Sequence, residues 1–239
     1  MIPIRDSTRS TTYPFVTKTI IFLNVVAFLW ELSLGPRLAQ AFLHLAIIPA
    51  RYTHPAEAAE IFGTFGSPVA ALAPFVSSMF LHGGWLHLIG NMWTLWIFGD
   101  NVEDRLGHVK FLCFYLAGGL AASLVHILTN STSGVPTIGA SGAVAAVMGA
   151  YFRFFPNARI EALIPPFFFG PTFVLPAVLF LGWWFFLQFF NGAMSLSVGQ
   201  RGFGGVAWWA HVGGFLFGLV VCLLARRRPS KARPIFIEI

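Results

Sequence analysis

The sequence predicts an all-α, polytopic membrane protein with six transmembrane helices, and three observations lead to this fold class. The chain has 239 residues, of which 56% are hydrophobic and only 10% are charged, whereas soluble domains contain roughly 45–50% apolar and about 25% charged residues. Its mean hydropathy is +0.74. Long apolar runs recur along the chain, and basic residues gather on one side of them. The composition excludes a soluble enzyme, a disordered chain and a fibrous protein.

The apolar runs define the expected elements. A helical crossing needs about 20 predominantly apolar residues to span a hydrocarbon core of ~30 Å. Six runs approach this length, at roughly 18–34, 85–99, 109–129, 138–155, 171–190 and 204–225. The second and fourth runs are short and rich in Gly or Ala, so composition does not mark their ends sharply. We therefore expect a cytoplasmic N-terminal segment at 1–17, one six-helix membrane domain at 18–226, and a basic cytoplasmic tail at 227–239.

The basic residues set the expected orientation. With six crossings both termini lie on one side of the membrane, and that side receives 12 of the 15 Lys and Arg residues. Only Arg37, Arg51 and Arg201 fall on the other side. The positive-inside rule then predicts that both termini are cytoplasmic. Topology thus accounts for the basic pI of about 9.9, and we expect no nucleic-acid partner.

Two segments do not read as spans. Residues 35–84 contain several prolines and only short apolar stretches, which favours a membrane-associated external loop between the first two helices, lying in the outer interface. Residues 191–203 are rich in Gly and Ser and predict a mobile external loop before the last helix.

Polar side chains inside apolar helices are candidates for function, because hydrocarbon penalises unpaired polar groups. Ser141 is expected about three residues into the fourth helix and His211 about seven into the sixth, so both lie on the order of 5–10 Å below the external end. His87 and Asn91 are four residues apart near the start of the second helix and share one face, and His82 lies just before them. These five positions therefore converge at one depth.

The sequence around Ser141 favours a nucleophile. Gly139 permits a tight turn before the helix and Gly142 a close helix contact, while a helix N-terminus suits a developing oxyanion. Small residues at Gly214 and Gly218 follow His211, so packing of the two helices brings Ser141 and His211 within reach of a hydrogen bond. Taken singly, a membrane Ser usually bonds its own backbone, a buried His is usually structural, and Asn91 could join helices.

At three places the chain resembles the rhomboid intramembrane serine proteases, in the six-helix form common in bacteria. Residues 80–92 (FLHGGWLHLIGNM) resemble the family's His and Asn motif, residues 139–142 (GASG) its nucleophile motif, and residues 210–214 (AHVGG) the motif of its catalytic His. The turn expected at 98–104 (FGDNVED) is also similar to the family. The resemblance extends from the first predicted span to the last.

The resemblance implies a Ser-His dyad without a cofactor or metal. Ser141 would be the nucleophile and His211 its base, while the Ser141 backbone N–H and the side chains of His87 and Asn91 would hold the oxyanion. His82, Gly139 and Gly142 would support them. Some members carry Tyr four residues after the serine, stacked on the catalytic His, but this chain has Ala145 there. His211 must then be oriented by another group, for which Trp208 and Trp209 are candidates.

The expected activity is hydrolysis of peptide bonds in or next to transmembrane segments of other membrane proteins, single-pass proteins among them, within the lipid bilayer. The chief alternative is a catalytically silent rhomboid-like scaffold that binds membrane helices. A channel would be expected to carry charged residues along a midplane path, and a zinc protease a His-Glu-x-x-His helix, which the sequence lacks. We expect a bacterial cytoplasmic membrane, and the sequence makes no prediction of oligomeric state.

Overall fold

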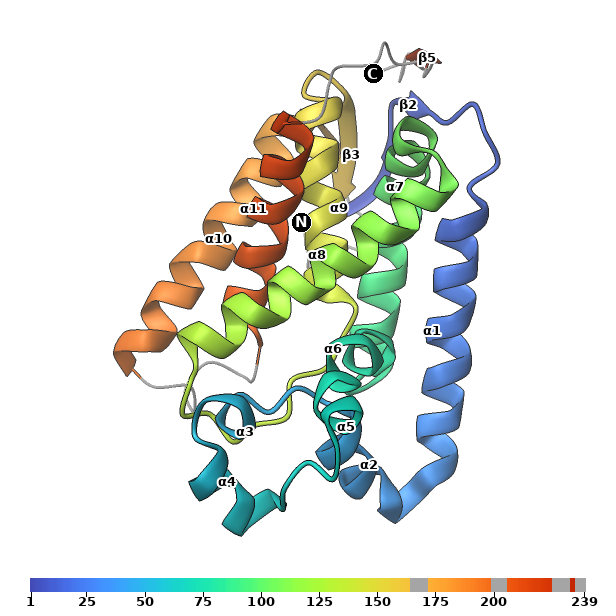
Figure 1. Ribbon diagram of the computed structural model, residues 1–239. Coiled ribbons are helices and arrows are strands. Elements are labelled where there is room, and N and C mark those ends of the chain that lie inside the picture. The colour runs from blue at the N-terminus through green and yellow to red at the C-terminus, as the bar shows by residue number, and fades with distance from the viewer. Residues whose placement is uncertain (164–171, 199–205, 225–232, 235–239) are drawn as a thin grey trace.

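The computed structural model describes residues 1–163, 172–198, 206–224 and 233–234, and in these ranges it is mainly helical (Figure 1). Each of the six predicted spans contains a helix. The six are α1 (Phe15–Leu34), α7 (Trp85–Leu106), α8 (His108–Thr129), α9 (Ser141–Phe154), α10 (Ala177–Val198) and α11 (Trp208–Leu224). The prediction of an all-α polytopic membrane protein is confirmed.

Some of these helices are long and apolar enough to cross a membrane. Three helical segments pass this criterion, namely Phe15–Leu45, His108–Thr129 and Ala177–Leu196, and a fourth is added if the bent pair Pro68–Phe80 and Trp85–Leu106 counts as one span. The described helix Trp208–Leu224 has 17 residues and α9 has 14. At 1.5 Å per residue α9 rises about 21 Å, so it cannot cross a hydrocarbon core of ~30 Å end to end.

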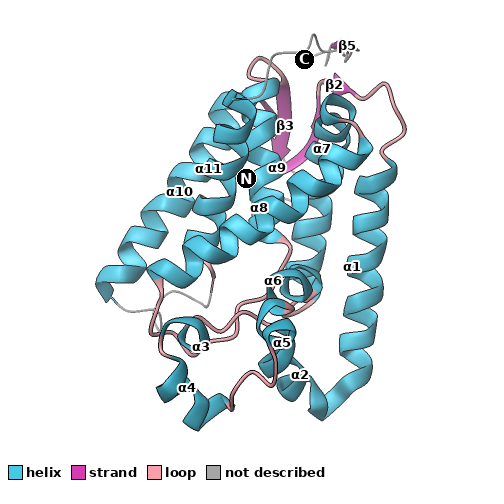
Figure 2. Cartoon of the chain, viewed as in Figure 1, coloured by secondary structure: helices cyan, strands magenta, loops and turns pink. Residues whose placement is uncertain are grey.

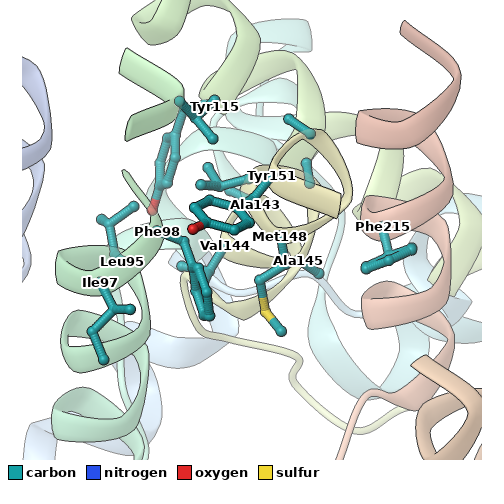
Figure 3. Packing of buried hydrophobic residues seen from close by; sticks show 14 of the residues in the cluster. Leu95, Ile97, Phe98, Tyr115, Ala143, Val144, Ala145, Met148, Tyr151 and Phe215 are labelled. Atoms are coloured by element: carbon teal, nitrogen blue, oxygen red, sulfur yellow. The ribbon is translucent and has the colours of Figure 1, made fainter. Parts of the chain in front are cut away.

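The short helix α9 lies at the centre of the bundle, between α7 and α11 (Figure 1). Every residue from Gly142 to Tyr151 is buried, as expected of a helix that is apolar on all sides and surrounded by protein. Large side chains from its neighbours complete the core (Figure 3). Phe98 of α7 meets Tyr151 edge to face, with ring centroids 4.9 Å apart. The core thereby fixes the helix that begins at Ser141.

The connection at 35–84 folds into a series of short helices at one end of the bundle (Figure 2). They are η1 (Gly35–Arg37), α2 (Leu38–Leu45), α3 (Ala50–Thr53), α4 (Pro55–Phe62), α5 (Pro68–Leu72), α6 (Pro74–Ser77) and η2 (Ser78–Phe80). Arg51 is buried among them and donates to the carbonyls of Leu43 (2.6 Å) and Gly63 (3.3 Å). The placement of this connection in the outer interface stays a prediction.

A small sheet forms at the other end, which sequence patterning did not predict. Strands β1 (Ile2–Asp6), β3 (Arg159–Leu163) and β4 (Thr172–Pro176) form an antiparallel sheet in the order β1-β3-β4. Strand β2 (Thr8–Arg9) pairs with β5 (Arg233–Pro234). The N-terminal segment is therefore partly strand, and the fifth span starts as strand β4, with helix only from Ala177. Apart from β5, the predicted basic tail lies outside the described residues.

Two predicted loops are helical instead. The turn expected at 98–104 is part of α7. An acidic side chain in this stretch binds the N-terminal segment. Glu103 is fully buried and accepts hydrogen bonds from the backbone N–H groups of Val16 (2.9 Å) and Thr17 (2.7 Å). Residues 191–198 continue α10, because Gly192 packs against Trp209 and its carbonyl accepts the indole N–H at 3.1 Å. The remainder of that predicted loop, 199–203, lies outside the described residues.

Candidate active site

Ser141 and His211 face each other across the contact between α9 and α11. The Oγ atom of Ser141 lies 2.8 Å from Nε2 of His211, a distance typical of a hydrogen bond. The two residues are 70 positions apart in sequence, so the contact exists only because the helices pack. The sequence-predicted pair is thus brought together as the resemblance implied.

The helices approach closely because Gly214 has no side chain. A Cβ atom at Gly214 would lie 2.0 Å from the carbonyl oxygen of Gly142, far inside contact distance. One turn further along α11, a Cβ atom at Gly218 would lie 1.9 Å from the carbonyl of Ala146. Backbone therefore meets backbone next to Ser141, and the predicted small-residue packing of these two helices is confirmed.

The helix starts differ from those expected. Ser141 is the first residue of α9 and His211 the fourth of α11, rather than about the third and the seventh. Thr137 exchanges backbone hydrogen bonds with Ile47 and Gly139 has a positive φ, so the helix cannot begin before the residue that caps it, Ala140. The first N–H groups of a helix have no intrahelical acceptor, so the backbone N–H of Ser141 lies at the end of α9 that suits an anion.

Gly139 forms the turn that leads into Ser141. Its φ is +125°, which L-residues with a side chain rarely adopt, and its N–H donates to the carbonyl of Ser78 at 2.8 Å. A Cβ atom here would lie 2.6 Å from Nε2 of His87. The turn therefore needs glycine both for its backbone conformation and for the imidazole packed against it.

His87 and Asn91 lie one turn apart on α7. The Nδ1 atom of His87 accepts the backbone N–H of Gly83 at 3.4 Å, so its proton is on Nε2, the nitrogen that faces the turn at Gly139. Asn91 is 7% exposed, and its Nδ2 group has no hydrogen-bond partner within the described ranges. Buried donors without partners are uncommon in folded proteins. Two N–H donors therefore lie one turn apart on α7, and that of His87 faces the turn that leads into Ser141.

His82 supports this region from the loop before α7. It is 1% exposed and its ring lies edge-on to that of His87, with centroids 5.1 Å apart. Its backbone N–H donates to the buried carboxylate of Glu31 at 3.1 Å. Sequence reasoning missed Glu31, because an acidic residue near the end of an apolar helix gives no sign of a partner 51 positions away.

Because the chain has Ala145 where some family members have Tyr, other side chains must contact His211. Nδ1 of His211 lies 2.8 Å from Oε1 of Gln188 on α10. The rings of Trp184 and Trp208 lie 5.9 and 6.4 Å from the imidazole centroid. Trp208 is therefore one of the neighbours, as anticipated, whereas Trp209 bonds the backbone of α10 instead.

A small cavity of mixed polar and apolar lining lies beside Ser141. Its volume is about 20 Å³, enough for one water molecule. Its lining includes the polar side chains of Ser78, Ser123, His126 and Thr137. His126, for which the sequence indicated no partner, contacts the Thr137 hydroxyl through Nε2 at 2.9 Å. The site therefore has room for a water molecule next to the serine hydroxyl.

Comparison with known proteins identifies the family. The profile of the Rhomboid domain family matches residues 70–228, about two thirds of the chain. The chain belongs to the rhomboid family. It is 31% identical to Presenilin-associated rhomboid-like protein A, mitochondrial, of Danio rerio over 156 residues, which are 61% of this chain and 36% of that protein.

Other relatives match over shorter or similar ranges. Identity is 29% with Presenilin-associated rhomboid-like protein, mitochondrial, of Homo sapiens, over 62% of this chain and 36% of that protein. It is 32% with Rhomboid protein 1, mitochondrial, of Saccharomyces cerevisiae, over 41% of this chain and 30% of that protein. The matched region spans about a third of the length of these relatives. These relatives are named as mitochondrial proteins, so they give no support to the predicted bacterial membrane. The comparisons support a membrane protein without indicating which membrane holds it.

Proposed function

We propose that this rhomboid protein is an intramembrane serine endopeptidase that hydrolyses peptide bonds in or next to transmembrane segments of other membrane proteins. The observation that carries the proposal is the 2.8 Å contact between Ser141 Oγ and His211 Nε2 at the start of a buried helix. A nucleophile and its base must be within hydrogen-bond distance of each other. A helix-binding scaffold has no chemical need for this pair.

In the first half of the reaction, His211 Nε2 accepts the proton of Ser141 as Oγ attacks the peptide carbonyl. The carbonyl oxygen becomes an oxyanion, for which the backbone N–H of Ser141, the Nε2–H of His87 and the Nδ2–H of Asn91 are the available donors. His211 then returns the proton to the leaving amine, and an acyl-enzyme remains on Ser141.

In the second half, water must reach the acyl-enzyme. The small cavity beside Ser141 offers space for one molecule. His211 takes a proton from this water, whose oxygen attacks the ester carbonyl, and then returns a proton to Ser141 Oγ as the carboxylic product leaves. The same imidazole nitrogen thereby serves both halves of the cycle.

Substrate choice follows from backbone chemistry. A transmembrane helix keeps all its amides hydrogen-bonded inside the bilayer, so it must unwind locally before a carbonyl reaches Ser141. Substrates with Gly, Pro or other helix-weakening residues near one membrane surface are therefore favoured. Comparison of a single-pass substrate with and without such residues tests this preference directly.

The test of the proposal uses the full chain reconstituted in lipid vesicles with a single-pass substrate. The unchanged protein should cut the substrate at one position that product mapping locates, and Ser141→Ala and His211→Ala should not cut it. Cleavage by Ser141→Ala at the original rate would refute the proposal. Binding of the substrate without any cleavage by the unchanged protein would favour the scaffold instead.

A further inference from the structure

Gln188 lies where the third member of a catalytic triad would lie. It is on α10, it is 7% exposed, and its Oε1 atom is 2.8 Å from His211 Nδ1. This nitrogen is on the opposite side of the imidazole from Nε2, which contacts Ser141. One line of contacts therefore runs from Gln188 through His211 to Ser141, across three helices.

The amide group of Gln188 has a defined orientation. Its Nε2 group donates to the backbone carbonyl of Trp184 at 3.4 Å. A carbonyl oxygen accepts hydrogen bonds but never donates them, so the NH₂ end of the amide must face Trp184. The oxygen end must consequently face His211. The helix backbone of α10 thus determines which atom the imidazole meets.

This orientation selects one tautomer of His211. Since Oε1 can only accept, Nδ1 of His211 must carry the proton and donate it to Gln188. A neutral imidazole has a single N–H, so Nε2 is then unprotonated and its lone pair points to the hydroxyl of Ser141. The other tautomer would place a proton between Nε2 and Ser141 and prevent base catalysis.

The neighbouring aromatic rings cannot perform this selection. Trp184 and Trp208 flank the imidazole, at interplanar angles of 34° and 85°, and so limit its rotation. An indole has one N–H donor and no acceptor, so neither ring can receive the Nδ1 proton. Steric confinement and tautomer selection therefore come from different side chains.

We propose that Gln188 is a positioning residue that holds His211 in the tautomer with a free Nε2, completing a Ser141–His211–Gln188 triad. This inference rests on the proposed protease function. When His211 accepts the Ser141 proton it becomes an imidazolium with protons on both nitrogens, and the Nδ1 proton stays on His211, because an amide oxygen is a very weak base. Gln188 therefore orients the base, and stabilises its charged form less than a carboxylate would.

The experiment compares Gln188→Leu, which removes the acceptor, with Gln188→Glu, which keeps an acceptor and adds charge. In the reconstituted full chain, Gln188→Leu should lower kcat roughly 10- to 100-fold while KM changes little, as expected for a lost hydrogen bond that leaves a buried N–H unpaired. Gln188→Glu should recover much of this loss, and the acidic limb of its pH–rate profile should move to higher pH, because a nearby carboxylate favours the imidazolium.

Ser195→Ala provides a matched control. Ser195 is buried two turns further along α10, and its hydroxyl donates to the Gly192 carbonyl at 2.7 Å within the same helix. This variant perturbs a polar group of α10 without removing the acceptor for Nδ1. We expect a kcat and a pH–rate profile close to those of the unchanged protein.

Three results would overturn the inference. The first is an unchanged kcat in Gln188→Leu, the second is an equal loss in Gln188→Leu and Ser195→Ala, and the third is a pH–rate profile of Gln188→Glu that does not move. Cleavage by Ser141→Ala would instead refute the protease itself. The rate at which a serine-directed phosphonate labels Ser141 is measured in parallel, because this reaction needs no cleavable substrate. Gln188→Leu should slow this labelling.

Discussion

The contact at Gly214 gives the most quantitative prediction, because it sets the distance between Ser141, the proposed nucleophile, and His211, its proposed base. In Gly214→Ala the new Cβ would lie 2.0 Å from the Gly142 carbonyl oxygen, whereas real Cβ contacts below 3.0 Å essentially never occur. Helices α9 and α11 must therefore separate by about 1 Å at this level. The Ser141–His211 contact would lengthen from 2.8 Å to roughly 3.8 Å, beyond the range of a hydrogen bond.

We expect cleavage by Gly214→Ala to fall at least about 100-fold, in line with the contribution of a well-placed general base. The assay measures initial cleavage rates in vesicles, divided by the folded fraction from thermal unfolding. Gly149→Ala is the matched steric variant, since its Cβ would meet the Phe215 carbonyl at 2.1 Å on the same helix interface, about 12 Å along α9 from Ser141.

Gly149→Ala should destabilise the fold comparably but reduce the rate of the folded protein much less. Gly182→Ala, whose Cβ would meet only a ring carbon of Phe152 at 3.8 Å, should behave like the unchanged protein. A folded Gly214→Ala protein that cuts at the full rate would refute the reasoning, because the site would then tolerate the separation of its two helices.

Three further predictions concern other groups. Asn91→Ala should lower kcat about 10- to 1000-fold with the fold intact, as for other oxyanion donors; an unchanged rate would remove Asn91 from the site. Glu103→Gln should cost about 1–3 kcal/mol of stability in denaturant titrations without slowing the folded protein, since its carboxylate holds α1 rather than the site. Burial raises the pKa of Asp6 from 3.8 to about 7, against the opposing effect of a hydrogen bond from Tyr151. The folded protein therefore binds more protons than the unfolded chain between about pH 4 and 7, so stability falls as the pH rises across this range and the loss is complete above about pH 7. Asp6→Asn should accordingly raise the Tm, relative to the unchanged protein, more at pH 8 than at pH 5; an equal difference at both pH values would contradict this assignment.

The residues that sequence analysis identified belong to short contiguous motifs. Ser141 lies between glycines, and His87 and Asn91 have helical spacing in an apolar run, so each carries a local signal of unusual polarity. The small residues after His211 predicted the helix contact that brings His211 to Ser141. Close helix packing requires only that bulky side chains be absent, which the sequence shows directly. Local pattern and membrane physics thus indicated these positions, whereas the role proposed for each came from the family resemblance.

Gln188 and the sheet could not be predicted in the same way. Gln188 is a single amide in a strongly aromatic helix, and its contact with His211 depends on how α10 is rotated against α11. Strand β1 is short, and its partner β3 lies about 150 residues further along the chain, so its pairing leaves no periodic pattern in either segment. The start of α9 was misjudged because apolar residues before Ser141 resemble helix, although the backbone pairing of Thr137 with Ile47 and the positive φ of Gly139 delay the helix.

The most direct measurement is mass spectrometry of the intact, membrane-embedded chain after reaction with a fluorophosphonate. An activated Ser141 predicts one phosphonate adduct, found on the peptide that carries Ser141, and loss of that adduct in His211→Ala. Equal labelling of the unchanged protein and His211→Ala, or an adduct on another serine, would contradict the pairing of this hydroxyl with this imidazole.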